Sequence, residues 1–179
     1  HGPARAVMVP TPDLHRRLSA RGFPNLAMWS RGVDTELFRP ADRAPFHGQR
    51  PVFLYAGRVS VEKNLVAFLS LELPGTQWVV GDGPARRALE RRFPRARFFG
   101  MKHGAELAWF FGQADAFVFP SRTDTFGLVM LEAMACGTPV AAFPVTGPID
   151  VVKPGVSGVL ADDLRAAALA ALELPRERV

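Results

Sequence analysis

Three charged side chains, Arg58, Lys63 and Asp124, are the strongest candidates for chemistry in this chain of 179 residues. Arg58 and Lys63 lie in the segment YAGRVSVEKN (55–64), and Asp124 lies in PSRTDTFGLVMLEAMACGTPV (120–140). Two such cations can hold a diphosphate, because arginine binds phosphate oxygens through two parallel hydrogen bonds. Lys63 is the more informative, because the chain has only three lysines. The alternative is a solvated loop between a strand and a helix.

The segment 120–140 also contains a predicted helix start. Thr125 or Asp124 is expected to cap this helix. The first-turn backbone amides of Gly127, Leu128 and Val129 then have no partner inside the helix and are free to bind an anion. Gly127 carries no side chain, so a phosphate can approach the backbone closely. A capped helix without a ligand explains the same residues equally well.

Glu132 lies in the apolar part of the same helix, so its carboxylate either finds hydrogen-bond donors or stays exposed to water. A ribose hydroxyl is one such donor, as in dinucleotide sites where an acid binds the ribose. An ordinary surface carboxylate is the alternative. Asp124 lies eight residues earlier, in the loop, so the two acids do not share one helical face. We expect separate contacts to one ligand rather than a shared proton.

The segment GDGPAR (81–86) is a weaker candidate. Its two glycines allow a tight turn, but it is not a G-x-G-x-x-G fingerprint, and no acid follows about twenty residues later. A plain turn before a helix that begins near Pro84 is the favoured interpretation.

The histidines and the single cysteine give no sign of a metal site. His15, His47 and His103 stand in unrelated contexts without metal-ligand spacing. Cys136 alone excludes an intramolecular disulfide and any site built from several cysteines. Because it lies in an apolar run, we expect it to be buried and unreactive. A lone cysteine suits a reducing cytoplasm.

Six short apolar runs bounded by Gly or Pro are predicted to be strands, with helical patterns between them. The strands are expected at 52–57, 77–81, 96–99, 116–119, 139–143 and 157–160, and the helices at 62–71, 84–92, 104–113, 127–136, 148–153 and 162–173. Apolar strands that alternate with helices predict an α/β fold, a Rossmann-like parallel sheet of about six strands flanked by helices. Ligands bind such a sheet beyond the carboxyl ends of its strands, where both candidate segments lie.

The first 50 residues have a different character. VMVP (7–10) is a possible strand and 12–21 a possible helix, but 22–50 is a stretch with many Pro, Gly and Arg residues. We interpret 1–40 as the end of a preceding unit plus a linker, and 41–179 as the sheet domain. The chain does not begin with Met, so we expect it to start within a longer protein. It shows no signal-peptide pattern and no apolar run of about 18 residues.

The charge is distributed unevenly along the chain. Residues 1–100 carry 16 basic and 8 acidic side chains, whereas 101–179 carry 6 and 9, and the whole chain has a formal charge of +5. A basic surface favours nucleotides, phosphates, nucleic acid or anionic lipid. A solvated arginine-rich surface is the simpler explanation for most of these residues. No nucleic-acid motif is present, so no nucleic-acid partner is expected.

At this point the segments resemble a known family. The chain is similar, from about residue 7 to 160, to the carboxyl-terminal, donor-binding domain of retaining glycosyltransferases of the GT-B fold, family four. Five segments occur in the order of that family: RGVDTELFRP, YAGRVSVEKN, VVGDGP, FFGMKHGAEL and PSRTDTFGLVMLEAMACGTPV. The first resembles the interdomain segment and the last the signature of two acids separated by seven residues.

The resemblance implies a role for each matching residue. Arg58 and Lys63 would contact the donor diphosphate after Gly57, and Asp124 would lie beside the transferred sugar. These three charged residues would be the catalytic ones. Glu132 would bind the ribose hydroxyls. The remaining donor-binding residues implied in this way are Gly83, Met101, Thr125, Phe126, Gly127, Leu128 and Val129, with Met101 near the base.

The sequence departs from the family pattern in three respects. Asp124 stands where the first acid is usually Glu, so its contact with the sugar is in doubt. Arg31 stands where Asn usually precedes the interdomain glycine. The acceptor-binding domain, with its histidine that touches the donor sugar in relatives, is absent from these residues.

The resemblance implies a cytoplasmic enzyme that moves a sugar from a UDP- or GDP-sugar to a glycan or lipid acceptor, with no metal required. Peripheral contact with the inner face of a membrane fits a lipid acceptor. We expect the 179 residues alone to bind nucleotide and transfer nothing. The alternatives are a nucleotide-sugar 2-epimerase or phosphorylase-like enzyme of the same architecture, and a non-enzymatic basic module that binds RNA or anionic membrane.

Overall fold

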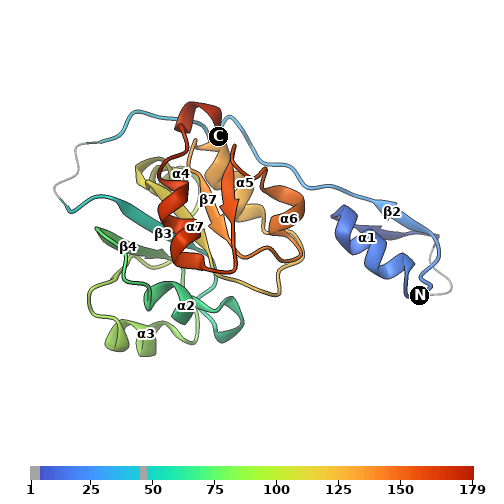
Figure 1. The fold of residues 1–179 in the computed structure, drawn as a ribbon, viewed down its shortest axis with the longest axis horizontal. Coiled ribbons are helices and arrows are strands. Elements are labelled where there is room, and N and C mark those ends of the chain that lie inside the picture. Colours follow the sequence, from blue (N-terminus) through green and yellow to red (C-terminus); the bar gives the residue numbers. More distant parts are fainter. Residues whose placement is uncertain (1–4, 45–47) are drawn as a thin grey trace.

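Most of the chain forms a six-stranded parallel sheet with helices on both faces, as seen in a computed structural model that describes residues 5–44 and 48–179 (Figure 1). The strands lie in the order β5-β4-β3-β6-β7-β8, and all pair in parallel. Their bounds are β3 Val52–Ala56, β4 Thr76–Val80, β5 Arg97–Phe98, β6 Ala116–Phe119, β7 Val140–Ala142 and β8 Gly158–Leu160. The predicted fold class is confirmed.

A helix lies in each connection predicted to hold one. The bounds are α2 Leu65–Leu69, α3 Arg86–Arg92, α4 Gly104–Gln113, α5 Leu128–Ala135, α6 Pro148–Val151 and α7 Leu164–Ala171. The helix predicted over 62–71 is interrupted: a 3-10 turn, η1 (Val61–Lys63), precedes α2, and Asn64 between them has a left-handed backbone with φ of 56°. A second 3-10 turn, η2 (Arg176–Arg178), ends the chain.

The sheet has two apolar faces because successive side chains of a strand point to opposite sides. Val52 and Leu54 of β3 belong to the core that packs beneath α4 and α5, whereas Phe53 and Tyr55 belong to the core beneath α2, α3 and α7. All five residues of β3 are buried. This double coverage explains why the strands read as continuous apolar runs.

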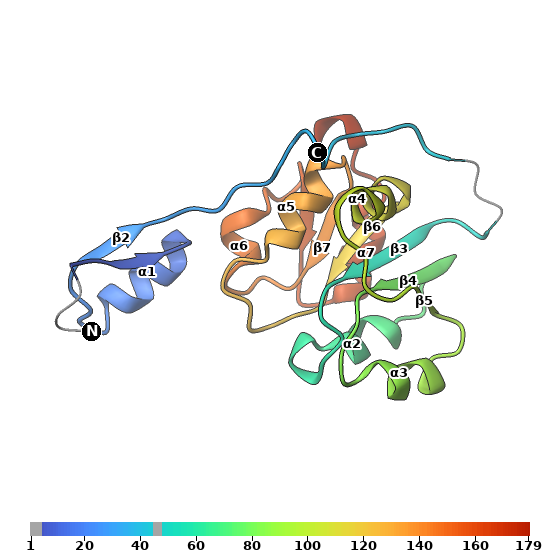
Figure 2. The same ribbon diagram turned by 180° about the vertical axis from the view of Figure 1, so that it is seen from behind.

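A small second unit precedes the sheet domain (Figure 2). It consists of β1 (Val7–Val9), α1 (Pro12–Ser19) and β2 (Leu26–Met28), and the two strands pair in parallel. The expected strand and helix of this region are found, but β2 falls in the stretch interpreted as irregular. It was missed because its apolar run is only three residues long and lies inside a stretch with many Pro, Gly and Arg residues. Residues 1–4, also assigned to this region, lie outside the described residues.

The two units touch near α6. The backbone amide of Asp13 donates to a carboxylate oxygen of Asp150 at 3.2 Å, and Thr146 binds both Asp13 and Arg17 at 2.8 Å. The connecting segment then runs along the sheet domain, where Phe38 is buried and packs edge-to-face on Phe111. The loop before α6 therefore contacts the small unit directly.

Candidate functional site

The strand order places a crevice at the centre of the sheet. The chain leaves β3 toward β4 on one side, and it leaves β6 toward β7 on the other. The loops that follow β3 and β6 therefore diverge, and open α/β sheets bind ligands at this point. The candidate segments 55–64 and 120–140 contain those two loops.

A pocket of about 630 Å³, here called the central pocket, opens between these loops. Most of the predicted site residues line it together: Gly57, Arg58, Lys63, Asp124, Thr125, Phe126, Gly127, Leu128 and Val129. Arg31, Tyr55, Ala56 and Phe119 complete the lining. Chain folding thus brings the two cations, the acid and the start of α5 to one place.

The loop after β3 is held as an extension of the sheet. The amides of Gly57 and Val59 donate to the carbonyls of Val80 and Asp82, at 2.9 and 2.8 Å. Between these two bonds the side chain of Arg58 is exposed at the pocket. The backbone that carries Arg58 is therefore fixed although its guanidinium is free to reach a ligand.

Tyr55, the only tyrosine of the chain, supports the same loop from inside. Its ring is buried, and its hydroxyl donates to the carbonyl oxygen of Arg58 at 2.7 Å. Burial, and then the negative charges of Asp124 and Glu62, raise the pKa of Tyr55 well above its ordinary value, so the hydroxyl keeps its proton. The sequence analysis missed this residue because a buried strand residue reads as core. Its uniqueness in the composition was the only available signal.

Lys63 and Asp124 meet across the pocket. The Lys63 ammonium lies 2.5 Å from a carboxylate oxygen of Asp124, and both side chains are partly exposed. Asn64 joins the same two loops, because its side-chain amide donates to the carbonyl of Pro120 at 3.0 Å. An ion pair and a hydrogen bond therefore connect the loops after β3 and β6 around the opening.

The start of α5 differs from the prediction. Neither Thr125 nor Asp124 caps the helix: Gly127 is the N-cap, with φ of 78° and no side-chain cap. The helix begins later than expected because this left-handed glycine turns the chain, while the Asp124 carboxylate binds Lys63 instead. Glycine is favoured here because its left-handed backbone, with φ of 78°, would strain a residue that carries a Cβ. Within the described residues, no hydrogen-bond acceptor for the amides of Gly127, Leu128 and Val129 is found.

Three predicted site residues do not line the central pocket. Met101 is half-exposed after β5, and Gly83 lies against the loop after β3, where a Cβ would be 2.4 Å from the Val59 carbonyl oxygen. Glu132 is partly buried in α5, and this burial raises the pKa of its carboxyl. Their proposed contacts with a nucleotide remain predictions.

Cys136 is buried, as expected, and burial raises the pKa of its thiol to about 11. A thiol with so high a pKa is a poor nucleophile at neutral pH. No group of three His, Cys, Asp or Glu residues suited to a metal ion occurs within residues 5–44 and 48–179. The sequence analysis found no metal-ligand spacing for His15, His47 and His103. Of these three, His47 lies outside the described residues.

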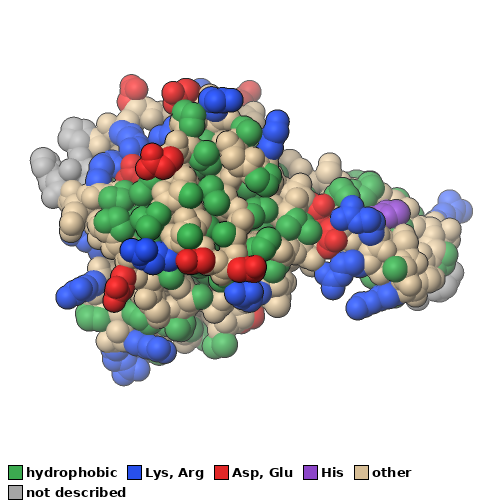
Figure 3. All heavy atoms as spheres, in the orientation of Figure 1, with side chains coloured by type: hydrophobic (Ala, Val, Ile, Leu, Met, Phe, Trp, Pro, Cys, Tyr) green, Lys and Arg blue, Asp and Glu red, His purple; other side chains and the backbone are tan. Residues whose placement is uncertain are grey.

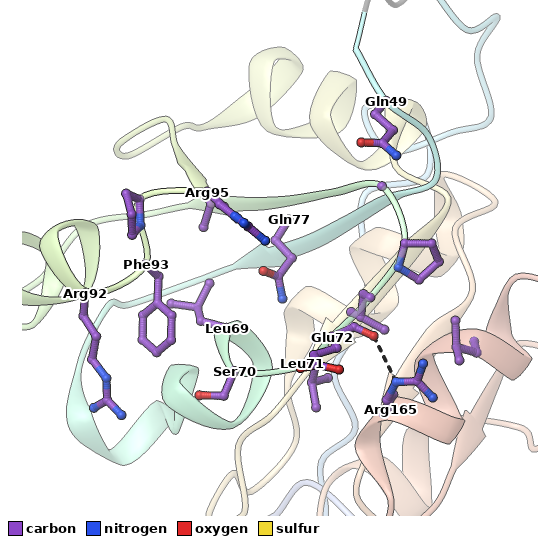
Figure 4. A pocket seen from close by; sticks show the side chains of 16 residues that line it. Gln49, Leu69, Ser70, Leu71, Glu72, Gln77, Arg92, Phe93, Arg95 and Arg165 are labelled. Carbon is purple, nitrogen blue, oxygen red and sulfur yellow. Dashed lines mark hydrogen bonds between the residues drawn. The ribbon is translucent and has the colours of Figure 1, made fainter.

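A wider hollow of about 1210 Å³ lies at the opposite edge of the sheet (Figure 4). It is lined by residues that precede β3, β4 and β5 and by the arginines Arg92, Arg95 and Arg165. Arg165 uses its Nε to donate to the Glu72 carbonyl oxygen at 2.9 Å. The smaller central pocket is the better candidate for a functional site, because it lies at the carboxyl edge and contains free helix amides beside cations.

Basic side chains also gather elsewhere on the surface. On the face seen in Figure 3 they lie over the small N-terminal unit and near α2 and α3, with acidic side chains between them. No helix within the described residues has both the length and the apolar character needed to cross a membrane.

Comparison with known sequences finds relatives that are glycosyltransferases. The chain is 33% identical over 168 residues to the GDP-mannose-dependent alpha-mannosyltransferase of Mycobacterium tuberculosis. This alignment covers 89% of this chain and 44% of that protein. It is 34% identical over 174 residues to sulfoquinovosyl transferase SQD2 of Arabidopsis thaliana. That alignment covers 88% of this chain and 34% of that protein. The chain thus spans less than half the length of these curated relatives.

Solved structures have the same fold. Sucrose-phosphate synthase from Thermosynechococcus elongatus superimposes with a TM-score of 0.78 at 26% identity, over 98% of this chain and 53% of that one. HepE from Anabaena, solved in complex with UDP, superimposes with a TM-score of 0.74 at 20% identity. The match covers 94% of this chain and 53% of that one. The family model described as glycosyl transferases group 1 matches residues 50–175. The chain belongs to this glycosyltransferase family, as the resemblance of its motifs implied.

Proposed function

We propose that this chain is the donor-binding part of a retaining glycosyltransferase and that the central pocket binds the diphosphate of a nucleotide sugar. One observation carries the proposal: Arg58, Lys63 and the unpaired amides at the start of α5 face one opening at the carboxyl edge of the sheet. Cations and free amides together favour a multiply charged anion. The relative from M. tuberculosis is named for GDP-mannose, and we extend the donor class to UDP- or GDP-sugars.

Residues around the pocket would stabilise charge as the reaction proceeds. When the bond between the sugar and the phosphate breaks, negative charge grows on the leaving diphosphate. Arg58, Lys63 and the helix amides stabilise that charge where it develops, which lowers the barrier. These groups supply the neutralising charge, so no metal is required.

Asp124 is proposed to act in two ways. Its carboxylate holds the Lys63 ammonium at the pocket, and we propose that it also contacts the transferred sugar. Glu132, with Gly83 and Met101, is proposed to contact the nucleoside, with Glu132 on the ribose and Met101 near the base. These three residues lie outside the pocket lining, so their proposed contacts rest on the resemblance of the motifs.

The acceptor is proposed to be a glycan or lipid bound by a further domain, with the small unit β1–α1–β2 as part of it. We expect a cytoplasmic location with peripheral contact at the inner face of the membrane. Since the matched relatives are more than twice as long as this chain, transfer itself is a property proposed for the longer protein.

A thermal-shift panel tests the proposal. The chain is incubated with UDP, GDP, UDP-glucose, GDP-mannose and, as a control, the free nucleosides. A ligand that binds only the native state raises the unfolding midpoint, so at least one diphosphate should raise it while its nucleoside has little effect. A folded chain whose midpoint responds to none of the nucleotides would contradict the proposed function. Transfer by the 179 residues alone would contradict the division of roles between domains.

A further inference from the structure

Arg31 lines the central pocket although it belongs to a distant part of the chain. It lies between β2 and β3, in the segment that connects the small unit to the sheet domain. Its neighbours in the pocket, Arg58, Lys63 and Asp124, all come from the loops of the sheet itself. The opening is therefore built from three separate stretches of sequence rather than from two.

The charged groups of the pocket have different partners. Lys63 is paired with Asp124 at 2.5 Å. Arg31 and Arg58 are exposed, and no carboxylate within residues 5–44 and 48–179 forms an ion pair with either guanidinium. With three cations and one acid in its lining, the pocket carries about two net positive charges, which matches the charge of the diphosphate bridge in a nucleotide sugar.

A guanidinium in this position is suited to phosphate. Its planar group can bind two phosphate oxygens at once through parallel hydrogen bonds. An exposed arginine without a protein partner has its donors available for a ligand. Lys63, in contrast, must share its ammonium with Asp124.

We propose that Arg31 is a third diphosphate-binding cation, supplied by the connecting segment, so that the bound nucleotide links this segment to the sheet. The inference rests on the proposed function and adds a residue and a consequence to it. Arg31 also lines a small hollow with Met8 of the small unit and with Trp29, the residue that follows β2. A ligand held by Arg31 and Arg58 together therefore restrains both units.

Isothermal titration of the chain with UDP and with GDP tests the role of Arg31. For whichever nucleotide binds the wild-type chain, Arg31→Ala should weaken the affinity by about tenfold or more, as expected for losing a hydrogen bond to a charged group. Arg31→Lys should recover part of the loss, because it restores the charge without the bidentate geometry. Arg39→Ala is the matched control: it removes an exposed arginine of the same segment that does not line the pocket.

Two further readouts separate phosphate binding from a general effect on folding. The loss should be largest for the diphosphate and small for the free nucleoside, and raising the salt concentration should reduce the difference between wild type and Arg31→Ala. Hydrogen exchange of residues 29–33 should slow when nucleotide is added to the wild type, but not to Arg31→Ala.

The outcomes distinguish the two proposals. If the wild-type chain binds neither nucleotide, the proposed function fails and the role of Arg31 fails with it. If the wild type binds and Arg31→Ala binds equally well, only the role of Arg31 is overturned. An equal loss in Arg39→Ala would also overturn it, because a general charge effect would then explain the result.

Discussion

The two edges of the central sheet use charge in opposite ways. At the amino edge, Asp115 accepts hydrogen bonds from Arg43 and Arg50 at 2.7 and 2.8 Å and from the Val52 amide at 2.7 Å. Arg176 at the same edge donates to the carbonyls that end α4 and to Thr138 at 3.1 Å. Each of these four charged side chains is bound by partners from the protein.

The carboxyl edge is different. Lys63 has one partner, Asp124, and Arg31 and Arg58 are exposed and line an open pocket. A charged group whose hydrogen bonds are all made to the protein holds segments of the chain together. A charged group with unused hydrogen-bonding capacity is available to a ligand. Substitutions at the first edge should therefore change stability, and substitutions at the second should change binding.

The largest expected effect is on stability, from Asp115→Asn. The variant keeps the size of the side chain but removes the charge that holds Arg43, Arg50 and β3 together. We expect the free energy of unfolding to fall by about 2–3 kcal/mol, because hydrogen bonds to a charged, partly buried group are lost. Urea unfolding measures the change. The affinity of the folded protein for nucleotide should stay the same, and a matching loss of affinity would break the comparison.

The pH dependence provides a second check on Asp115. Burial alone would raise the pKa of its carboxyl, but the Val52 amide and the two arginines outweigh burial and hold the pKa below its ordinary value. Its contribution to stability is therefore complete above about pH 4, the ordinary aspartate value, and is lost as pH falls through the folded-state pKa. The difference between wild type and Asp115→Asn should shrink in acid. A difference that grows on acidification would show that another group is responsible.

Lys63→Ala should have the next largest effect, this time on binding. Loss of a charge-assisted bond to phosphate should weaken nucleoside diphosphate affinity by about tenfold to a hundredfold, measured by titration calorimetry. Stability should change by less than about 1 kcal/mol, because the Lys63–Asp124 pair is partly exposed.

Lys153→Ala is the control for this experiment, because Lys153 is exposed and lies outside the central pocket. It should leave both affinity and stability unchanged. Undiminished affinity in Lys63→Ala would remove Lys63 from the binding site and leave Arg31 and Arg58 as the only cations to test.

Tyr55→Phe should have the smallest effect. It removes a hydrogen bond that holds the backbone of Arg58 but leaves the charged side chains of the pocket unchanged. Removing the hydroxyl leaves the Arg58 carbonyl without its donor, which we expect to cost about 1 kcal/mol of stability. Nucleotide affinity should fall only a few-fold, because Arg58 remains present but less well positioned.

A double variant distinguishes positioning from a separate contact. If Tyr55 acts through Arg58, the affinity loss from Tyr55→Phe should disappear in an Arg58→Ala background, since the positioned group is gone. Additive losses would indicate that Tyr55 affects binding by another route.

Local sequence was sufficient for the elements with strong patterns. The strand at 116–119 and the helix at 104–113 were predicted with the bounds that the structure shows, because continuous apolar runs and helical spacing are unambiguous there. β2 was missed because three residues are too few to show the alternation of a strand. The cap of α5 was predicted wrongly, because Asp124 can serve either as a cap or as a partner of Lys63, and only the fold decides between these.

The sequence by itself determined the α/β class, the order of its elements and the two loops that carry charged side chains. These follow from apolar periodicity and from residue types, which are properties of short segments. Only the tertiary structure decided which charged side chains meet: Lys63 with Asp124, and Arg31 beside both loops. Such contacts join residues far apart in the chain, and their geometry depends on how strands pair and loops diverge, which no local pattern encodes.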